Sequence, residues 1–173
     1  TAIYVTYTPV TEKELLLHRR AETDGMTGVY NKVTAEAMIR ERLQAADGVP
    51  CAMLMVDVDD LKLINDSQGH PQGDRAICLI ADTLRGQFRK TDIVGRIGGD
   101  EFVVFLVGVE SREKLQSLAA GLLQNLSGVR IGQQNDLPVC ASVGIANAHT
   151  GSITFDELYA QADKALYEAK KSG

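Results

Sequence analysis

The sequence predicts an α/β fold, an α+β sandwich in which helices flank a mixed central β-sheet. Apolar runs of strand length alternate with segments of helical periodicity, and two of the runs close around a glycine-rich turn. The 173 residues, 45% of them hydrophobic, suffice for one compact domain with a substantial core. We expect residues 1–20 to form an N-terminal leader and residues 21–173 to form that domain.

The leader has the pattern of a strand followed by a helix. Residues 1–10 alternate between apolar and polar side chains, and Pro9 separates them from a helical stretch over 12–22. The two readings are the last strand and connecting helix of an upstream sensory domain, or a frayed terminus. Because the chain begins at Thr1, further segments, including a membrane anchor, could precede it.

The first half of the domain contains four predicted elements. A helix is expected over 34–46, with Thr34 as its N-cap and a Gly-Val-Pro stop behind it. The run at 51–56 is apolar on both faces, which predicts a buried interior strand rather than an edge strand. Apolar residues at helical spacing over 77–88 predict a helix, and residues 93–107 predict a hairpin around a Gly-Gly-Asp-Glu turn.

The last third continues the alternation of helix and strand. Leucines and alanine over 115–126 predict an amphipathic helix. Residues 139–146 predict a strand, for which residues 130–134 are a candidate partner. Thr154 and Glu157 form a capping box that begins the final helix.

Composition excludes several classes of protein. The net charge of −5 disfavours non-specific nucleic-acid binding but allows a nucleotide held through a divalent metal. No stretch approaches the roughly 20 apolar residues of a membrane span, so we expect a cytoplasmic location and no membrane contact by this part. Cys51, Cys78 and Cys140 form no C-x-x-C pair, which predicts small buried side chains rather than disulfides or a zinc site.

The turn Gly98-Gly99-Asp100-Glu101 is the most informative local feature. Its glycines can take φ > 0 and admit a ligand to the backbone, although most such turns only reverse the chain. Asp57 ends the buried strand, where an acid either caps a helix or coordinates a hard cation. If the two strands are neighbours, their carboxylates converge and require a cation, for which Mg²⁺ with bridging phosphates is the natural choice.

Phosphates would have to be held without a Walker loop, because the G-x-x-x-x-G-K-[ST] pattern is absent from the sequence. Lys62 and Lys170 are the candidate phosphate ligands. Surface lysines are usually only solvated, and nothing intrinsic to these two positions distinguishes them from that alternative.

A polar turn follows Lys62. Asn65 and Asp74 could present an acceptor and donor pattern to a purine edge, with Gly69 and Gly73 making a tight turn between them. Local capping is the alternative for each side chain. His70 lies in the same turn and could equally be a packing residue.

Four ordered motifs together resemble the GGDEF-domain diguanylate cyclases. They are D-V-D-D-L-K-L-I-N-D-S-Q-G-H-P-Q-G-D over 57–74, R-K-T-D over 89–92, R-I-G-G-D-E-F over 96–102 and A-D-K-A-L-Y-E-A-K over 162–170. The D-G-M-T run at 24–27, with Asn31, is similar to the opening motif of that family. The resemblance covers about residues 20–173 and implies a nucleotidyl-cyclase, palm-like fold.

The resemblance also implies a metal-dependent mechanism. By similarity, Asp57, the backbone carbonyl of Val58 and Asp100 would hold Mg²⁺, with Mn²⁺ as an alternative. Asp100 or Glu101 would help to deprotonate an attacking 3′-hydroxyl, and Asp100 is favoured because it would contact the metal. Lys62 would stabilise the transition state by balancing phosphate charge.

A substrate site is implied as well. Its residues would be Leu61, which stands where an aromatic residue is common, together with Asn65, His70, Asp74, Gly98, Gly99 and Lys170. Asn65 and Asp74 would read guanine, Lys170 would neutralise phosphate charge, and the glycines would admit the phosphates. A carboxylate at Asp74 can accept from both guanine N1–H and N2–H₂, which predicts GTP over ATP.

The implied reaction joins two GTP molecules, one on each protomer of a homodimer, into cyclic di-GMP with loss of pyrophosphate. Arg89 and Asp92 match the family's R-x-x-D product-inhibition site, against the alternative of a local Arg–Asp pair. Rival readings are a silent receptor of cyclic di-GMP or GTP, and a dimerising signalling domain without nucleotide affinity. Departures from the family pattern are Met26 for Leu, Lys32 for Arg, and an end at Gly173 before the usual Arg-Asn.

Overall fold

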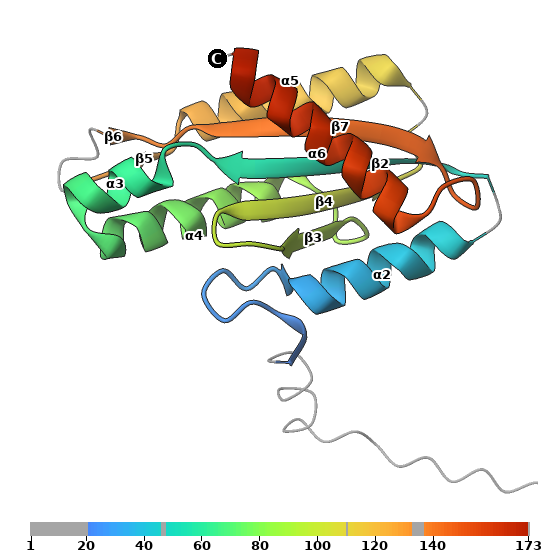
Figure 1. The fold of residues 1–173 in the computed structure, drawn as a ribbon, viewed down its shortest axis with the longest axis horizontal. Coiled ribbons are helices and arrows are strands. Elements are labelled where there is room, and N and C mark those ends of the chain that lie inside the picture. Colours follow the sequence, from blue (N-terminus) through green and yellow to red (C-terminus); the bar gives the residue numbers. More distant parts are fainter. Residues whose placement is uncertain (1–20, 46–47, 110, 133–136, 173) are drawn as a thin grey trace, which may run out of the picture.

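A five-stranded sheet runs through the computed structural model, which describes residues 21–45, 48–109, 111–132 and 137–172 (Figure 1). The strands are β1 (Tyr30–Asn31), β2 (Pro50–Val58), β3 (Ile93–Arg96), β4 (Glu101–Val107), β5 (Arg130–Ile131), β6 (Leu137–Pro138) and β7 (Ala141–His149). The helices are α2 (Lys32–Gln44), α3 (Leu61–Gln68), α4 (His70–Gln87), α5 (Arg112–Ser127) and α6 (Phe155–Ser172). The leader expected over 1–20 lies outside the described residues.

The sheet has the order β1-β3-β4-β2-β7, and β5 with β6 forms a separate two-stranded ribbon. β1 pairs with β3 in parallel, whereas the other pairs of the main sheet are antiparallel. The mixed sheet flanked by helices is therefore confirmed. β2 lies between β4 and β7, as its doubly apolar sequence predicted.

The two faces of the sheet are covered by different helices because side chains alternate along each strand. Ala52, Leu54 and Val56 of β2 belong to the core beneath α4 and α5. Met53 and Met55 belong to the opposite core, beneath α2 and α6. Figure 1 shows α6 crossing the front of the sheet, with α4 and α5 behind it.

Several predicted boundaries differ from the structure. α2 begins at Lys32, and its N-cap is Asn31, whose side chain accepts a 3.0 Å hydrogen bond from Thr34 N. The sequence reading placed the cap at Thr34 because Thr is also a preferred cap residue. α3 was not predicted, since eight residues are too few for helical spacing to stand out in the sequence, and only one of their side chains is buried.

The C-terminal third contains one error and one confirmation. Arg130–Ile131 pairs with Leu137–Pro138 rather than with the long strand β7, and Gln133 and Gln134 of the expected partner lie outside the described residues. The capping box is confirmed, because Glu157 N donates to Thr154 Oγ1 at 3.3 Å and Thr154 N donates to Glu157 Oε2 at 3.0 Å.

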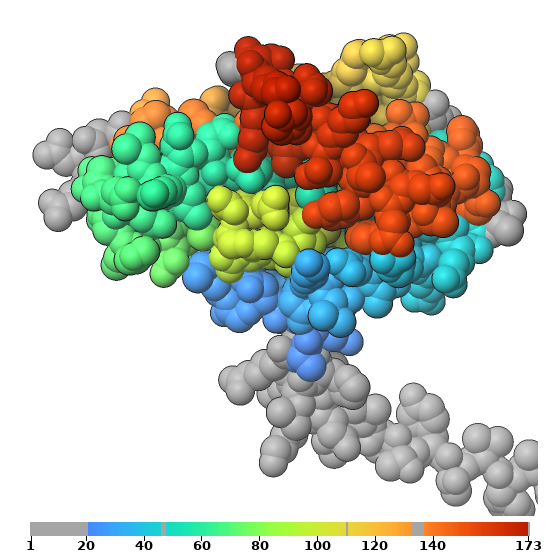
Figure 2. Space-filling model, viewed as in Figure 1, coloured from blue at the N-terminus to red at the C-terminus, as the bar shows by residue number. Residues whose placement is uncertain are grey.

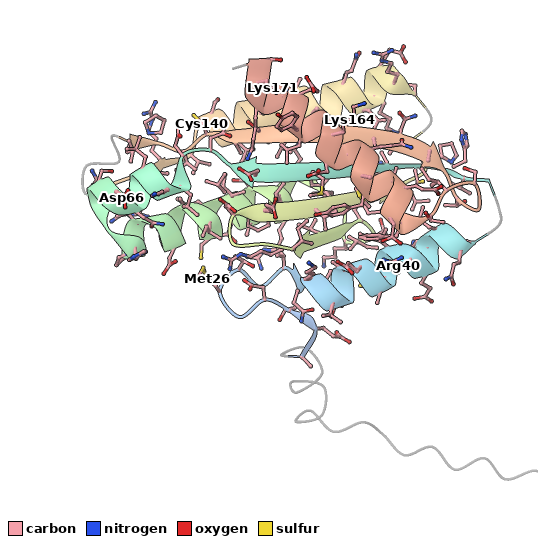
Figure 3. All side chains as sticks on the ribbon, in the orientation of Figure 1. Met26, Arg40, Asp66, Cys140, Lys164 and Lys171 are labelled. Carbon is pink, nitrogen blue, oxygen red and sulfur yellow. The ribbon has the colours of Figure 1, made fainter. Side chains whose placement is uncertain are left out.

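The cysteines differ in exposure. Cys51 is buried, Cys78 is half-buried and Cys140 is exposed, so the expectation of three buried side chains is confirmed only for Cys51. Cys140 precedes β7 at the end of the sheet nearest α3 (Figure 3). All three are free thiols. Within the part of the chain that the structure describes, no helix combines the length and apolar character needed to cross a bilayer.

α2 and α6 are joined by Arg40. Its guanidinium donates to both carboxylate oxygens of Asp156, at 2.8 and 3.1 Å, and lies 4.4 Å above the ring of Phe155 (Figure 3). The pair is largely exposed, so solvent screens its charge, but the two-pronged geometry fixes the relative position of the helices.

α6 packs directly on the backbone of β7 at Gly144. A Cβ atom at this position would overlap the backbone nitrogen of Leu166 and the carbonyl oxygen of Ala162. A residue with a side chain would therefore force the helix away from the sheet.

We expect Gly144→Ala to destabilise the fold by about 1–3 kcal/mol, because the backbone atoms it would meet cannot move independently. Gly86→Ala on α4 is the matched control: nothing lies within 4 Å of its Cβ position, and it should stabilise the fold by about 0.4–1 kcal/mol. Urea unfolding of both variants measures the difference. Equal stability of the two variants would contradict the close packing of α6 on β7.

Candidate active site

Acidic residues of two strands meet at one end of the sheet. Asp57 of β2 lies directly opposite Glu101 of β4 in the antiparallel register, so their side chains share a face. Val58 N donates a 3.1 Å hydrogen bond to the carbonyl oxygen of Asp100. The convergence expected from the sequence, conditional on neighbouring strands, is therefore present.

An open cavity of about 550 Å³ lies at this edge. Its lining contains six of the predicted site residues, namely Asp57, Val58, Leu61, Lys62, Asp100 and Lys170. It also contains Asp59, Asp60, Cys140 and Ser142. In Figure 2 the yellow-green hairpin turn lies between the green helices α3 and α4 and the red helix α6.

Lys170 binds the carboxylate of Asp57. The distance from Lys170 Nζ to Asp57 Oδ1 is 2.7 Å, and the Asp57 side chain is only 10% exposed, against 41% for Lys170. Burial raises the pKa of Asp57, and the carboxylates of Asp100 and Asp59 add to this, outweighing the opposite effect of Lys170. Burial works against the charged form of Lys170, but its hydrogen bond to Asp57 prevails and raises the pKa of the amine.

The hairpin turn does not use the left-handed conformation that its glycines permit. Neither Gly98 nor Gly99 has a positive φ. Gly98 is instead constrained by the carboxylate of Glu101, which occupies the space of a Cβ atom, while Gly99 faces open space. Burial raises the pKa of Glu101, with further increases from the nearby charges of Asp57, Asp100 and Asp163.

The predicted guanine-reading residues lie on the two helices beside the cavity and are not part of its lining. Gly69, at φ 85°, joins α3 to α4. Gly73 lies in the first turn of α4 rather than in a tight turn, and the amide of Asn65 packs against it so closely that a Cβ would overlap Oδ1. His70 and Asp74 are exposed on the same turn of α4.

Arg96 holds the hairpin turn, a role that sequence reasoning missed. Its Nη2 donates to the carbonyl oxygen of Gly99 at 2.6 Å, and its Nη1 donates to Asp24 Oδ1 at 3.2 Å. Asp24 also accepts from the backbone and hydroxyl of Thr27, at 2.9 and 2.7 Å. Burial opposes the charged form of Asp24, but the hydrogen bonds from Thr27 and Arg96 outweigh it and lower the pKa.

A second missed group fixes the segment after β2. Asp59 N donates to the carbonyl oxygen of Cys140 at 3.0 Å, and Ser142 Oγ donates to Asp59 Oδ1 at 2.8 Å. Asp60 then takes the left-handed conformation, at φ 53°. These contacts turn the chain sharply away from β7 and into α3, which brings Lys62 to the cavity. In the sequence, the acidic run after the strand was the only feature that indicated these contacts.

The donor set suits a divalent cation that also binds a phosphate ligand. Asp57 and Asp100 offer carboxylate oxygens to the cavity. Val58, which follows Asp57 and is hydrogen-bonded to Asp100 through its backbone nitrogen, lines the same cavity and can add its carbonyl oxygen. Among the described residues no three His, Cys, Asp or Glu side chains form a metal cage. Mg²⁺ is commonly held by one or two carboxylates plus substrate phosphates, so two carboxylates and a carbonyl fit this chemistry.

Arg89 and Asp92 lie elsewhere, at the start of β3. Arg89 N donates to Asp92 Oδ2 at 2.8 Å, and Asp92 N donates to the carbonyl oxygen of Arg89 at 3.0 Å, so Asp92 has a local turn-forming role. Both residues line a cavity of about 690 Å³ together with Arg85 and Lys90. The lining carries three cationic side chains, those of Arg85, Arg89 and Lys90, and two carboxylates, those of Glu22 and Asp92.

Comparison with known proteins identifies relatives over most of the chain. Residues 21–173 match the family described as "Diguanylate cyclase, GGDEF domain". The probable diguanylate cyclase DgcC of Escherichia coli K12 is 33% identical over 172 residues, which cover 98% of this chain and 46% of that protein. The chain spans about half the length of the curated relatives it matches.

Solved structures give the same result. The diguanylate cyclase SiaD of Pseudomonas aeruginosa, in complex with its activator SiaC, superposes with a TM-score of 0.82 at 28% identity, covering 94% of this chain and 63% of that chain. A microbial GGDEF domain, solved for its interaction with bis-(3,5)-cyclic di-GMP, has a TM-score of 0.76 at 33% identity, with coverages of 91% and 95%. The predicted α+β fold is thus shared with both.

We expect Asp24→Asn to lower the free energy of unfolding at neutral pH by about 1 kcal/mol, because the charge-assisted bond from Arg96 is weakened. The pKa of Asp24 in the folded state lies below its ordinary value of 3.8, so the contribution is complete above that pH. It disappears as the pH falls through the lowered pKa, where parent and variant become equally stable. Urea unfolding across an acid pH series measures this difference.

The matched control is Asp82→Asn, which breaks an exposed ion pair with Arg85. Solvent screening should keep its effect within about 0.5 kcal/mol. A difference between the parent and Asp24→Asn that stayed constant to the acid end of the series would contradict the assigned ion pair.

Proposed function

This chain belongs to the GGDEF-domain diguanylate cyclase family, and we propose that it condenses two GTP molecules into cyclic di-GMP across a homodimer. Each 3′-hydroxyl attacks the α-phosphorus of the GTP on the facing copy. One phosphorus–oxygen bond forms, the bond to the bridging oxygen breaks, and pyrophosphate leaves. The observation that carries the proposal is the convergence of Asp57, Asp100, Lys62 and Lys170 on one open cavity.

The proposed cation is magnesium, with manganese as the alternative. Asp57, Asp100 and the carbonyl of Val58 would hold it, in agreement with their shared position at the cavity. When bound, it would lower the pKa of the attacking hydroxyl and neutralise charge on the phosphate oxygens.

The protein's own groups supply the remaining chemistry. Asp100 accepts the proton of the 3′-hydroxyl in preference to Glu101, because Asp100 faces the cavity whereas Glu101 folds over Gly98. Lys62 donates to the phosphate oxygens as negative charge develops in the transition state, and Lys170 neutralises the phosphate chain. Gly99 faces open space and leaves room for the phosphates beside the turn, whereas the Glu101 carboxylate fills the corresponding space at Gly98.

Guanine recognition is assigned to the junction of α3 and α4. The carboxylate of Asp74 accepts from the N1–H and N2–H₂ donors of guanine, and the amide of Asn65 adds a further hydrogen bond. Gly73 supports this role because it has no side chain, and the Asn65 amide packs into the space that a Cβ atom would occupy. Leu61 and His70 line the same side of the nucleotide. GTP is preferred over ATP because adenine offers no such donor pair to Asp74.

Product binding is assigned to the second cavity. The Arg89 guanidinium is exposed beside Asp92 and can bind phosphate oxygens and a guanine edge of cyclic di-GMP. The neighbouring Lys90 and Arg85, of which Arg85 also pairs with Asp82, add positive charge for an anionic ligand at the same surface. Because this cavity is separate from the acidic one, it also supports the second candidate function, a catalytically silent receptor of cyclic di-GMP.

We expect the purified chain to convert GTP, but not ATP, into cyclic di-GMP when magnesium is present. Asp100→Asn should lower the rate at least about 100-fold, because it removes the proton acceptor and a cation ligand. Asp66→Asn, on an exposed position of α3, is the control and should keep the parental rate (Figure 3). Chromatography and mass spectrometry identify the product.

If the parent chain formed no product at concentrations that give a dimer, the proposed enzymatic function would be contradicted and the receptor function would remain. We expect Arg89→Ala to weaken cyclic di-GMP binding at least about tenfold, because a charged hydrogen-bond donor is lost. Calorimetry with the Asp100→Asn background measures this affinity without turnover. Undiminished affinity in Arg89→Ala would remove the assigned product site.

A further inference from the structure

Lys170 continues a stripe of core residues on α6. The stripe consists of Leu158, Ala162 and Leu166, which are spaced four apart and buried at 0–3% exposure. Lys170 is the next position in this series, so it faces the sheet in the last turn of the helix. On β2, Met53 and Met55 face the same helix, and Asp57 is the next residue on that face. Both apolar stripes therefore end in one ion pair.

The position of α6 on the sheet brings the two members of the ion pair together. Gly144 allows α6 to approach the sheet at backbone distance, which fixes the height of the helix above β2. The last turn of α6, marked by Lys171 in Figure 3, lies toward the end of the sheet at which β2 ends, and Lys170 Nζ reaches Asp57 Oδ1 at 2.7 Å. The Asp57 side chain is 10% exposed, so its carboxylate has little access to water as a substitute partner.

We infer that Lys170 competes with the divalent cation for Asp57 and is released to the nucleotide phosphates, so that cation and nucleotide bind with positive coupling. The inference rests on the proposed function for the assignment of Asp57 as a cation ligand and of phosphates as the substrate group. It adds a state of the nucleotide-free site in which Lys170 is paired with Asp57 and keeps the divalent cation from binding there.

The physical reason is that an ammonium and a divalent cation on the same carboxylate repel each other, whether they share Oδ1 or take one oxygen each, and the 10% exposure of Asp57 leaves little water to screen that repulsion. A cation that needs Asp57 binds only the fraction of molecules from which Lys170 has withdrawn, and its apparent affinity falls by that fraction. Phosphate oxygens offer the ammonium an equally strong charge-assisted partner. Nucleotide binding therefore frees Asp57, and by linkage the cation strengthens nucleotide binding by the same factor.

The test is a titration of the nucleotide-free chain with Mn²⁺, in which electron paramagnetic resonance measures the free ion. Lys170→Met, which keeps the length and packing of the side chain, should tighten Mn²⁺ binding about tenfold. Lys170→Arg should stay within about twofold of the parent because it keeps the ion pair. Asp57→Asn should abolish the binding in every background, which assigns the measured ion to this site. Circular dichroism confirms that each variant is folded.

Removal of any lysine raises the negative potential of the site, so two matched controls are needed. Lys164→Met and Lys171→Met change exposed lysines of the same helix and should alter Mn²⁺ affinity less than about twofold (Figure 3). A GTP analogue with a methylene bridge between the α- and β-phosphorus atoms should tighten Mn²⁺ binding about tenfold more in the parent than in Lys170→Met.

Equal Mn²⁺ affinities of parent and Lys170→Met would overturn the inference, as would binding that survives Asp57→Asn or a tightening shared by the two control variants. Loss of cyclic di-GMP synthesis is a separate result. If the chain made no cyclic di-GMP but Lys170→Met alone tightened Mn²⁺, the competition would stand and the proposed enzyme would fall.

Discussion

The antiparallel register between β2 and β4 is the constraint on which the acidic site depends. It sets Asp57 opposite Glu101 and ties Val58 to Asp100 through a backbone hydrogen bond. Side chains alternate along a strand, so a slip of one residue would turn Asp57 into the core beneath α4 and α5. Different side chains pack on the two faces of β2, Ala52, Leu54 and Val56 on one and Met53 and Met55 on the other, so such a slip would disrupt the packing of both cores. Core packing thereby helps to fix the position of the carboxylates.

The groups around the cavity come from elements that are held independently. The turn after β2 is fixed by Asp59 and Ser142, which orients the start of α3. α6 is fixed on the other side by Gly144 and by the Arg40–Asp156 pair. The acids, Lys62 and Lys170 are therefore arranged by three separate sets of contacts, so one substitution outside the cavity moves one group without moving the others.

Sequence patterns predicted the mixed sheet, the interior strand β2 and the acidic hairpin, because burial and alternation are read from nearby residues. They predicted neither α3 nor the pairing of β5 with β6, which are too short for periodicity to show. Sequence patterns singled out Lys62 and Lys170 only as candidate phosphate ligands, and they offered no sign of the ion pair between Lys170 and Asp57, which depends on how α6 lies over β2. Arg96 was missed for the same reason: its partner Asp24 is distant in sequence and near only in the fold.

The hydrogen bonds that Arg96 makes to Gly99 and Asp24 also imply an order of events during folding. β3 and β4 are joined by a short turn, so their hairpin closes a small loop and can form early. The bond from Arg96 to Asp24 joins residues that are 72 apart in sequence. The entropic cost of closing so long a loop is offset only when the N-terminal segment docks beside β3. We therefore expect the hairpin that carries Asp100 and Glu101 to form first and its turn to become rigid last.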